Sequence, residues 1–119
     1  SVLFARGAGI DPERLLALLE PAHPSRVRAA ARRLLSARDS GWRLAVNVAL
    51  LTDAEPALAL RARNDLAAAL KQQLYTLPKG RAADLISSHL TDADQILPAA
   101  QARLLRFILG RTQPATADA

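Results

Sequence analysis

The apolar residues of this chain recur at the spacing of a helix face, and no stretch shows the two-residue alternation of a strand. Two segments carry the clearest stripes. The first stripe consists of Val27, Ala30, Ala31, Leu34 and Leu35, and the second of Leu58, Ala62, Leu66, Ala69 and Leu70. A stripe of this kind covers the side of a helix that packs on a core. The pattern predicts an all-α protein of about six helices with short connections.

The composition favours the same fold class. Hydrophobic residues make up 50% of the chain and aromatic residues only 3%. The core must therefore consist mainly of Leu and Ala, which favours closely packed helices, because strands are rich in aromatic and β-branched residues. The length of 119 residues is that of one domain. Without any Cys, the chain can form neither a disulfide nor a thiolate metal site.

Short signals mark the ends of the first helices. Asp11 is a suitable N-cap, and Pro12 suits the first helical position that follows. Pro21 and Pro24 are expected to end this first helix. Ser25 is predicted to cap the second helix.

The third helix is predicted over residues 42–53, after a break at Ser40 and Gly41. It is nearly all apolar, so we expect it to be buried. Trp42, at its start, is expected in the core or between helix pairs rather than at a ligand site.

The later helices begin at equally local signals. Thr52 and Glu55 have the spacing of a capping box for the fourth helix. Residues 77–80 are turn material, and a fifth helix is predicted over residues 81–90. Pro98 is expected to start the last helix.

The chain is expected to hold one domain over residues 11–110, between a lead-in at 1–10 and a flexible tail at 111–119. It lacks Met, as an excised or processed chain would. The first ten residues are too short and too interrupted for a signal peptide, and no run reaches the roughly 20 apolar residues of a membrane span. We expect a cytoplasmic protein with no membrane span.

The chain is basic, with a net charge of +5 and a pI of about 11.0. A positive field of this kind attracts nucleic acid, anionic lipid or an acidic protein. Nearly all of the basic residues are Arg, which binds phosphate and carboxylate in bidentate fashion. A second interpretation is codon bias, because Ala and Arg are abundant together, as in proteins from GC-rich genomes. Both interpretations remain open on the sequence.

The helices fall into pairs that resemble one another. Residues 50–70 align with residues 89–109 at an offset of 39. The matched positions are Thr52 with Thr91, Asp53 with Asp92, Leu58 with Leu97, Leu66 with Leu105, and Leu70 with Leu109. An offset of 33 places Glu20 on Asp53 and Arg28 on Arg61. One helical hairpin cannot bury its own apolar face, whereas three stacked hairpins form a continuous core.

These features resemble the HEAT/armadillo class of α-solenoid repeats. The resemblance rests on an acidic residue after each first helix, at Glu20, Asp53 and Asp92, and on the segment Val27-Arg28-Ala29-Ala30-Ala31. It covers roughly residues 11–110 and implies a short right-handed solenoid of antiparallel helix pairs. It also implies that Arg28 and Arg61 serve the packing of their own repeats. Ala100 and Asn64 depart from the pattern, and the alternative fold is a compact helical bundle.

The sequence offers no catalytic constellation. Asp84, Ser87, Ser88 and His89 are close together, but a nucleophile and its base usually come from separate elements, and we interpret them as surface residues. His23 and His89 lack a third metal ligand. Some DNA glycosylases have HEAT-like scaffolds, yet they are longer and more aromatic. We therefore expect no enzyme activity, cofactor, metal or small-molecule substrate.

The favoured function is a non-catalytic interaction module within a larger protein. If the second helices of the repeats line a concave surface, they present a ladder of Arg residues that suits an acidic protein or peptide segment. The predicted contact residues are Arg28, Arg32, Arg61, Arg63, Arg103 and Arg106. The alternative is nucleic-acid binding through the same side chains. A third interpretation is a spacer or oligomerisation domain, in which the apolar segment 103–109 docks on another surface.

Overall fold

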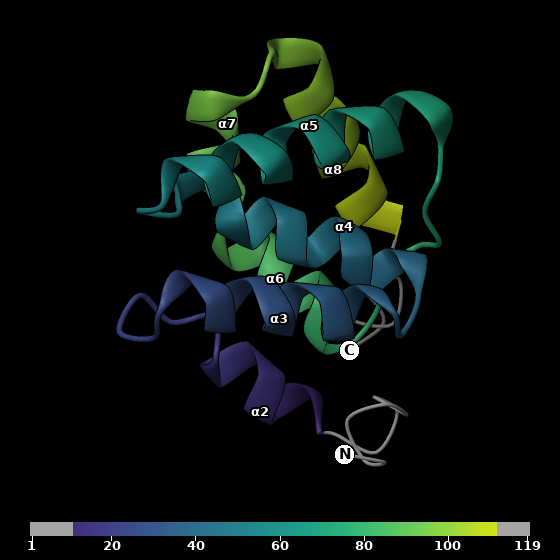
Figure 1. Ribbon diagram of the computed structural model, residues 1–119. Helices are drawn as coiled ribbons and strands as arrows, with labels where there is room; N and C mark the ends of the chain where they lie inside the picture. The colour runs from purple at the N-terminus through teal and green to yellow at the C-terminus, as the bar shows by residue number, and fades with distance from the viewer. Residues whose placement is uncertain (1–10, 112–119) are drawn as a thin grey trace.

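The computed structural model describes residues 11–111, and these residues contain helices and no strand (Figure 1). The all-α prediction is therefore confirmed. The elements are α2 (Pro12–Ala17), α3 (Ser25–Ser36), α4 (Ser40–Ala49), the 3₁₀-helix η1 (Leu50–Thr52), α5 (Pro56–Gln72), α6 (Arg81–Ser88), α7 (Leu90–Ile96) and α8 (Ala99–Arg111). The predicted lead-in over 1–10 and residues 112–119 of the predicted tail lie outside the described residues. Arg111, the first residue of that predicted tail, is the last residue of α8.

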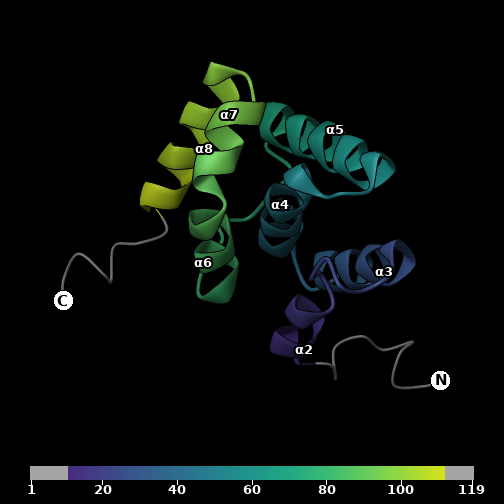
Figure 2. The same cartoon turned by 90° about the vertical axis from the view of Figure 1, so that its left-hand side faces the viewer.

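Helix α4 lies at the centre of the molecule, and α3, α5 and α6 pack around it (Figure 2). Its sequence explains this position, because Arg43 is its one exposed residue. Trp42 is buried in the core, as predicted. Burying each aliphatic side chain stabilises the fold by roughly 1.5–3 kcal/mol, so an apolar helix is most stable when it is surrounded. Helix α4 is thus the support on which α3 and α5 are held.

The beginning of α4 differs from the prediction. Ser40 and Gly41 are its first residues rather than a break, because the carboxylate of Asp39 accepts a hydrogen bond of 2.9 Å from the Trp42 N–H and caps the helix. The Gly41 N–H donates to the Thr76 hydroxyl at 3.0 Å. This end of α4 is therefore fixed against the segment that follows α5.

Of the N-caps predicted for the first two helices, one is confirmed and one is wrong. Asp11 caps α2 by accepting from the Glu13 N–H, as expected. The prediction for Ser25 was wrong, because Ser25 is itself the first residue of α3. The N-cap is Pro24, whose extended backbone leads into the helix without a side-chain hydrogen bond. A proline fixes φ and sets the direction of entry by itself.

The capping box predicted for Thr52 and Glu55 is also absent. Instead, the Asp53 carboxylate accepts from the Glu55 N–H at 2.9 Å, and Pro56 is the first residue of α5. The apolar face predicted for this helix is confirmed in full. Its buried residues are Leu58, Ala62, Leu66, Ala69 and Leu70.

The last third of the described chain contains one more helix than predicted. Helix α6 ends at Ser88, and His89 leaves the helical region with φ −111° and ψ 11°. The short helix α7 follows and had not been predicted as a separate element. Helix α8 then begins directly after Pro98, in agreement with the prediction.

Leucines that the internal repeat matches are buried in both copies, but the matched acidic residues lie in different kinds of element. Leu66 and Leu105 are buried on equivalent faces of α5 and α8. The acidic positions differ, because Asp53 lies in the loop before α5 whereas Asp92 lies inside α7. The sequence similarity thus marks the second helix of each pair and not the turn that precedes it.

Candidate interaction surface

The six arginines predicted to form one ladder occupy three different environments. Arg28 is buried, with 5% of the residue exposed, and Arg32 is half-buried. The exposed members are Arg61 and Arg63 on α5, and Arg103 and Arg106 on α8. Figure 2 shows α3 and α5 on one side of α4 and α8 on the other. The ladder is therefore not continuous across the three pairs.

Arg28 makes a bidentate ion pair with Asp53. Its Nε lies 2.7 Å from Oδ1 and its Nη2 lies 2.8 Å from Oδ2, and both side chains are only 6% exposed. Its Nη1 donates to the carbonyl of His23. These bonds join the turn before α3, α3 itself and the loop before α5. The prediction that Arg28 contacts a partner does not fit this position, because its guanidinium is used inside the fold.

The ion pair is charged at neutral pH. Burial raises the pKa of the Asp53 carboxyl, but hydrogen bonds from Arg28 and from the Glu55 N–H, together with the Arg28 charge, bring that pKa below its ordinary value. The hydrogen bond to Asp53 raises the pKa of the Arg28 guanidinium. Arg28 and Asp53 thus form a structural clamp, as the resemblance to HEAT repeats implied for Arg28.

Arg32 lies one helical turn further along α3 and is held much more loosely. Its Nη1 lies 3.3 Å from Oδ2 of Asp65 and 3.4 Å from Oδ1 of Asn47. The same Asp65 oxygen lies 3.8 Å from the Nε of Arg61. One carboxylate is therefore shared by two guanidinium groups, and neither distance is that of a close ion pair. We call this set of four residues the α3–α5 junction.

Two buried polar groups of the α3–α5 junction have no hydrogen-bond partner. These are Nε of Arg32 and Nδ2 of Asn47, although Asn47 is fully buried. Burial lowers the pKa of Arg32, and Asp65 offsets this only in part, because the charges of Arg61 and Arg33 act in the same direction as burial. The junction therefore carries more positive charge and more N–H donors than its own acceptors satisfy.

Asn47 and Asp65 were missed by the sequence analysis, although each left a signal. Asn47 is the one polar residue in the run Leu44–Leu51, and a lone polar residue inside a buried helix usually bonds to a neighbouring element. Asp65 follows Arg61 by four residues, so the two lie on the same side of α5. The contact of either residue with α3 depends on tertiary structure and could not be read from the sequence.

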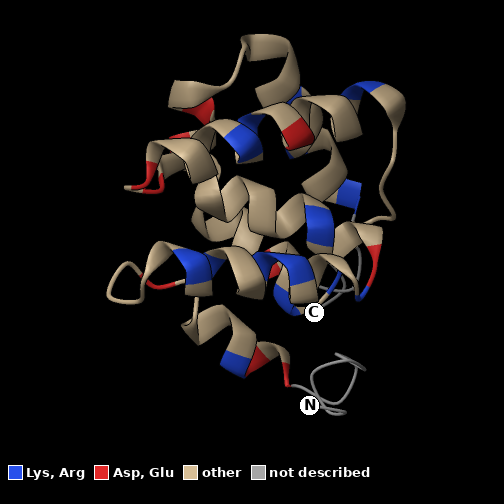
Figure 3. Cartoon of the chain, in the orientation of Figure 1, with Lys and Arg blue, Asp and Glu red and all other residues tan. Residues whose placement is uncertain are grey.

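Helices α3 and α5 together carry a large excess of positive charge (Figure 3). They contain seven basic residues and one acidic residue, Asp65. Arg26, Arg33, Arg61 and Arg63 are exposed. On α5, a shallow hollow of about 440 Å³ is lined by Ala57, Leu60, Arg61, Asn64 and Asp65. Leu60 is 55% exposed there, which adds an apolar contact point beside the charges. Leu60 and Arg61 thus place an apolar and a basic group at one hollow, and Arg26, Arg33 and Arg63 add exposed positive charge on the same two helices.

The arginines of α8 are arranged differently. Arg106 forms an ion pair with Asp94, and Arg111 lies over the Phe107 ring, 5.6 Å from its centroid. The apolar segment 103–109 mostly faces inward, since Leu105, Ile108 and Leu109 are buried. Phe107 is its one large exposed apolar residue.

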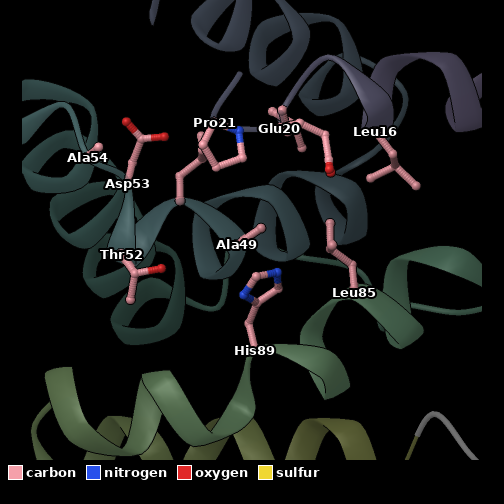
Figure 4. A pocket seen from close by; sticks show the side chains of 11 residues that line it. Leu16, Glu20, Pro21, Ala49, Thr52, Asp53, Ala54, Leu85 and His89 are labelled. Carbon is pink, nitrogen blue, oxygen red and sulfur yellow. The ribbon is translucent and has the colours of Figure 1, made fainter. Parts of the chain in front are cut away.

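A second hollow of about 370 Å³ lies between the end of α2, η1 and α6 (Figure 4). Leu16, Ala49 and Leu85 provide apolar walls, and Figure 4 shows the His89 ring pointing into the space from the end of α6. Thr52 and Asp53 also line it. Asp53 is already paired with Arg28, so the other polar side chains that line this hollow are those of Glu20, Thr52 and His89.

The residues with hydrolase-like chemistry do not converge on one another. Ser88 donates to the carbonyl of Leu85 at 3.0 Å, and Asp84 lies 3.9 Å from Arg81. His89 Nδ1 lies 3.8 Å from Asp92. Each of these groups therefore has a local neighbour instead of forming a relay.

The described residues hold neither a metal-binding cluster nor a membrane-spanning helix. Between residues 11 and 111, no three His, Asp or Glu side chains are grouped so as to hold a metal ion. Within the same range, no helix has both the length and the apolar character needed to cross a bilayer. Comparison with protein-family models, curated proteins and solved structures yields no match to this chain.

Proposed function

We propose that this chain is a non-catalytic module that binds an acidic segment of a protein partner across α3 and α5. The observation that carries the proposal is the excess positive charge of these two helices, which hold seven basic residues and one acidic residue, and which keep this excess after Arg28 is paired with Asp53. Charge-assisted hydrogen bonds from arginine to carboxylate are stronger than neutral ones and give geometric specificity. An acidic segment supplies the acceptors that this surface lacks.

The proposed contact residues are Arg33, Arg61 and Arg63, with Leu60 as an apolar contact. All four are exposed on the two helices that project on the same side of α4 (Figure 2). Arg28 is left out because its guanidinium is buried against Asp53. Arg103 and Arg106 are left out because α8 lies on the other side of α4 from α3 (Figure 2), and Arg106 is already paired with Asp94.

The proposal includes a HEAT-like arrangement of helix pairs in a cytoplasmic chain. Two features support this arrangement over an irregular bundle. The first helices α4 and α6 pack on each other, and the second helices α5 and α8 do the same. The Arg28–Asp53 clamp joins one pair to the next, as in a stack of repeats. In such a stack, α3 and α5 provide the surface for an extended or helical segment.

Nucleic acid is the competing partner, because exposed arginines also bind phosphate. Single strands are disfavoured, since neither α3 nor α5 contains an aromatic residue on which bases could stack. A protein segment also makes better use of Leu60, because an apolar side chain gains little from a phosphate backbone.

The test compares three labelled ligands by fluorescence anisotropy over a salt series. The ligands are a Glu- and Leu-containing peptide, its Gln counterpart and a random-sequence DNA duplex. We expect micromolar binding of the acidic peptide only, weakened by at least about tenfold in the variant R33Q/R61Q/R63Q. The matched control R14Q/K79Q/R111Q loses the same charge elsewhere and should bind as the unchanged chain does.

Two results would overturn the proposal. The first is the absence of acidic-peptide binding even at low salt. The second is duplex binding that is tighter than peptide binding, falls steeply with salt and is lost in the same variant, which would make nucleic acid the partner.

A further inference from the structure

The α3–α5 junction differs from the Arg28–Asp53 clamp in one respect that bears on binding. In the clamp, one guanidinium has one carboxylate to itself at 2.7 and 2.8 Å. In the junction, Arg32 and Arg61 share the carboxylate of Asp65 at 3.3 and 3.8 Å. The clamp is therefore complete, whereas the junction lacks one acceptor.

We infer that the α3–α5 junction is the receptor for one carboxylate side chain of the acidic partner, with Asp65 as its internal competitor. This inference rests on the proposed function and names the residues that recognise the partner's carboxylate. The partner carboxylate is held between the guanidinium groups of Arg32 and Arg61. Asp65, whose side chain is 42% exposed, can turn to solvent when that carboxylate enters.

Asn47 acts as a positioning residue in this receptor. Its Oδ1 accepts from Nη1 of Arg32 at 3.4 Å, a long bond that orients the guanidinium toward the edge of α4 without holding it rigidly. The Arg32 side chain is only 11% exposed, so it is already ordered before a partner binds. An ordered guanidinium loses less conformational entropy on binding than a free surface arginine does. Arg61, at 69% exposure, is the movable half of the receptor.

If the junction is the receptor, removing its acidic residue should strengthen the binding of the acidic peptide. Removing the charge of Asp65 frees both guanidinium groups, so the variant D65N should bind the acidic peptide about two- to fivefold more tightly. The matched control is D84N on α6, which raises the net charge equally on an exposed residue outside the junction. D84N should leave the affinity unchanged, and R61Q should weaken it.

The same titrations identify the place of the bound carboxylate. A series of peptides, each with one Glu replaced by Gln, should contain one member whose affinity no longer responds to D65N. If D65N and D84N increased the affinity for the acidic peptide equally, net charge alone would explain the increase, and the receptor assignment would be wrong. Weaker binding by D65N would also overturn it, because Asp65 would then support the site. Tightening seen with the DNA duplex and not with the peptide would assign the junction to phosphate.

The outcomes separate the two proposals. If the unchanged chain fails to bind the acidic peptide, the proposed function itself fails. If it binds, but D65N and D84N have the same effect, only the receptor is wrong. Circular dichroism melts of D65N and D84N, expected within a few degrees of the unchanged chain, ensure that altered affinity does not reflect altered folding.

Discussion

Two arginines on one helix show how strongly the role of a residue depends on its acceptors. Arg28 and Arg32 are one turn apart on α3, and the sequence gives both the same surroundings of Ala, Leu and Arg. The ion pair with Asp53 makes Arg28 a buried structural residue, whereas Asp65 leaves Arg32 with N–H donors that have no acceptor. The sequence could not reveal this difference, because Asp53 lies 25 residues away from Arg28. Only the resemblance to HEAT repeats pointed to a structural role.

The Arg28–Asp53 clamp should contribute strongly to stability. The substitution Asp53→Ala leaves a buried guanidinium without its carboxylate and should lower the Tm by roughly 10 °C or more. Thermal unfolding followed by circular dichroism measures the change. Asp65→Ala is the control, because Asp65 is half-exposed and should cost only a few degrees. A loss for Asp53→Ala no greater than for Asp65→Ala would show that the clamp is not structural.

The clamp also gives stability a defined acid dependence. The pKa of Asp53 is below its ordinary value of about 3.8 in the folded state, so the unfolded chain takes up a proton first as the pH falls. The stabilisation is complete above the unfolded pKa and is lost as the pH falls through the folded pKa. Urea unfolding at several pH values should therefore show the unchanged chain and D53N converging below about pH 4. A constant difference between them down to pH 2.5 would contradict this assignment.

At the scale of elements, the docking of α4 on the segment after α5 depends on a close approach at Gly41. A Cβ at this position would lie 3.2 Å from the Cα of Pro78 and 3.2 Å from the Thr76 hydroxyl. The substitution Gly41→Ala should therefore lower the free energy of unfolding by about 1–3 kcal/mol through overpacking.

Gly110 provides the matched comparison in denaturant unfolding. It lies in α8, and a Cβ there would meet no atom within 4 Å. Gly110→Ala should raise the free energy of unfolding by up to about 1 kcal/mol, because alanine is the better helix former. Equal effects of the two substitutions would show that the approach at Gly41 is not tight.

Helices with strong periodicity were predictable, and their junctions were not. The buried face of α5 followed from spacing alone, because a stripe of Leu and Ala at helical intervals has one way to reach the core. The start of α5 was predicted wrongly, since Asp53 and not Thr52 provides the local acceptor. Helix α7 was missed because it has only seven residues and follows α6 after one break. Tertiary packing determines such short elements.

At the scale of the whole molecule, the positions of α3, α5 and α8 decide which arginines can act together. The sequence predicted one ladder over three helix pairs, but α8, which packs on α5, lies on the other side of α4 from α3 (Figure 2). Spacing along the chain carries no information about this, because the angle between successive pairs is set by packing around α4. The proposed binding surface is therefore confined to α3 and α5, and the proposed partner segment need span only these two helices.

The most direct test is NMR spectroscopy of the ¹⁵N-labelled chain titrated with the acidic peptide. The account predicts that the largest amide shift changes lie on α3 and α5, around Arg33, Arg61 and Arg63, with smaller changes at Asn47. Residues of α8 around Phe107 and the hollow beside His89 should be unaffected. Changes concentrated on α8 or around His89, or no saturable change at all, would contradict the assignment of α3 and α5 as the partner-binding surface.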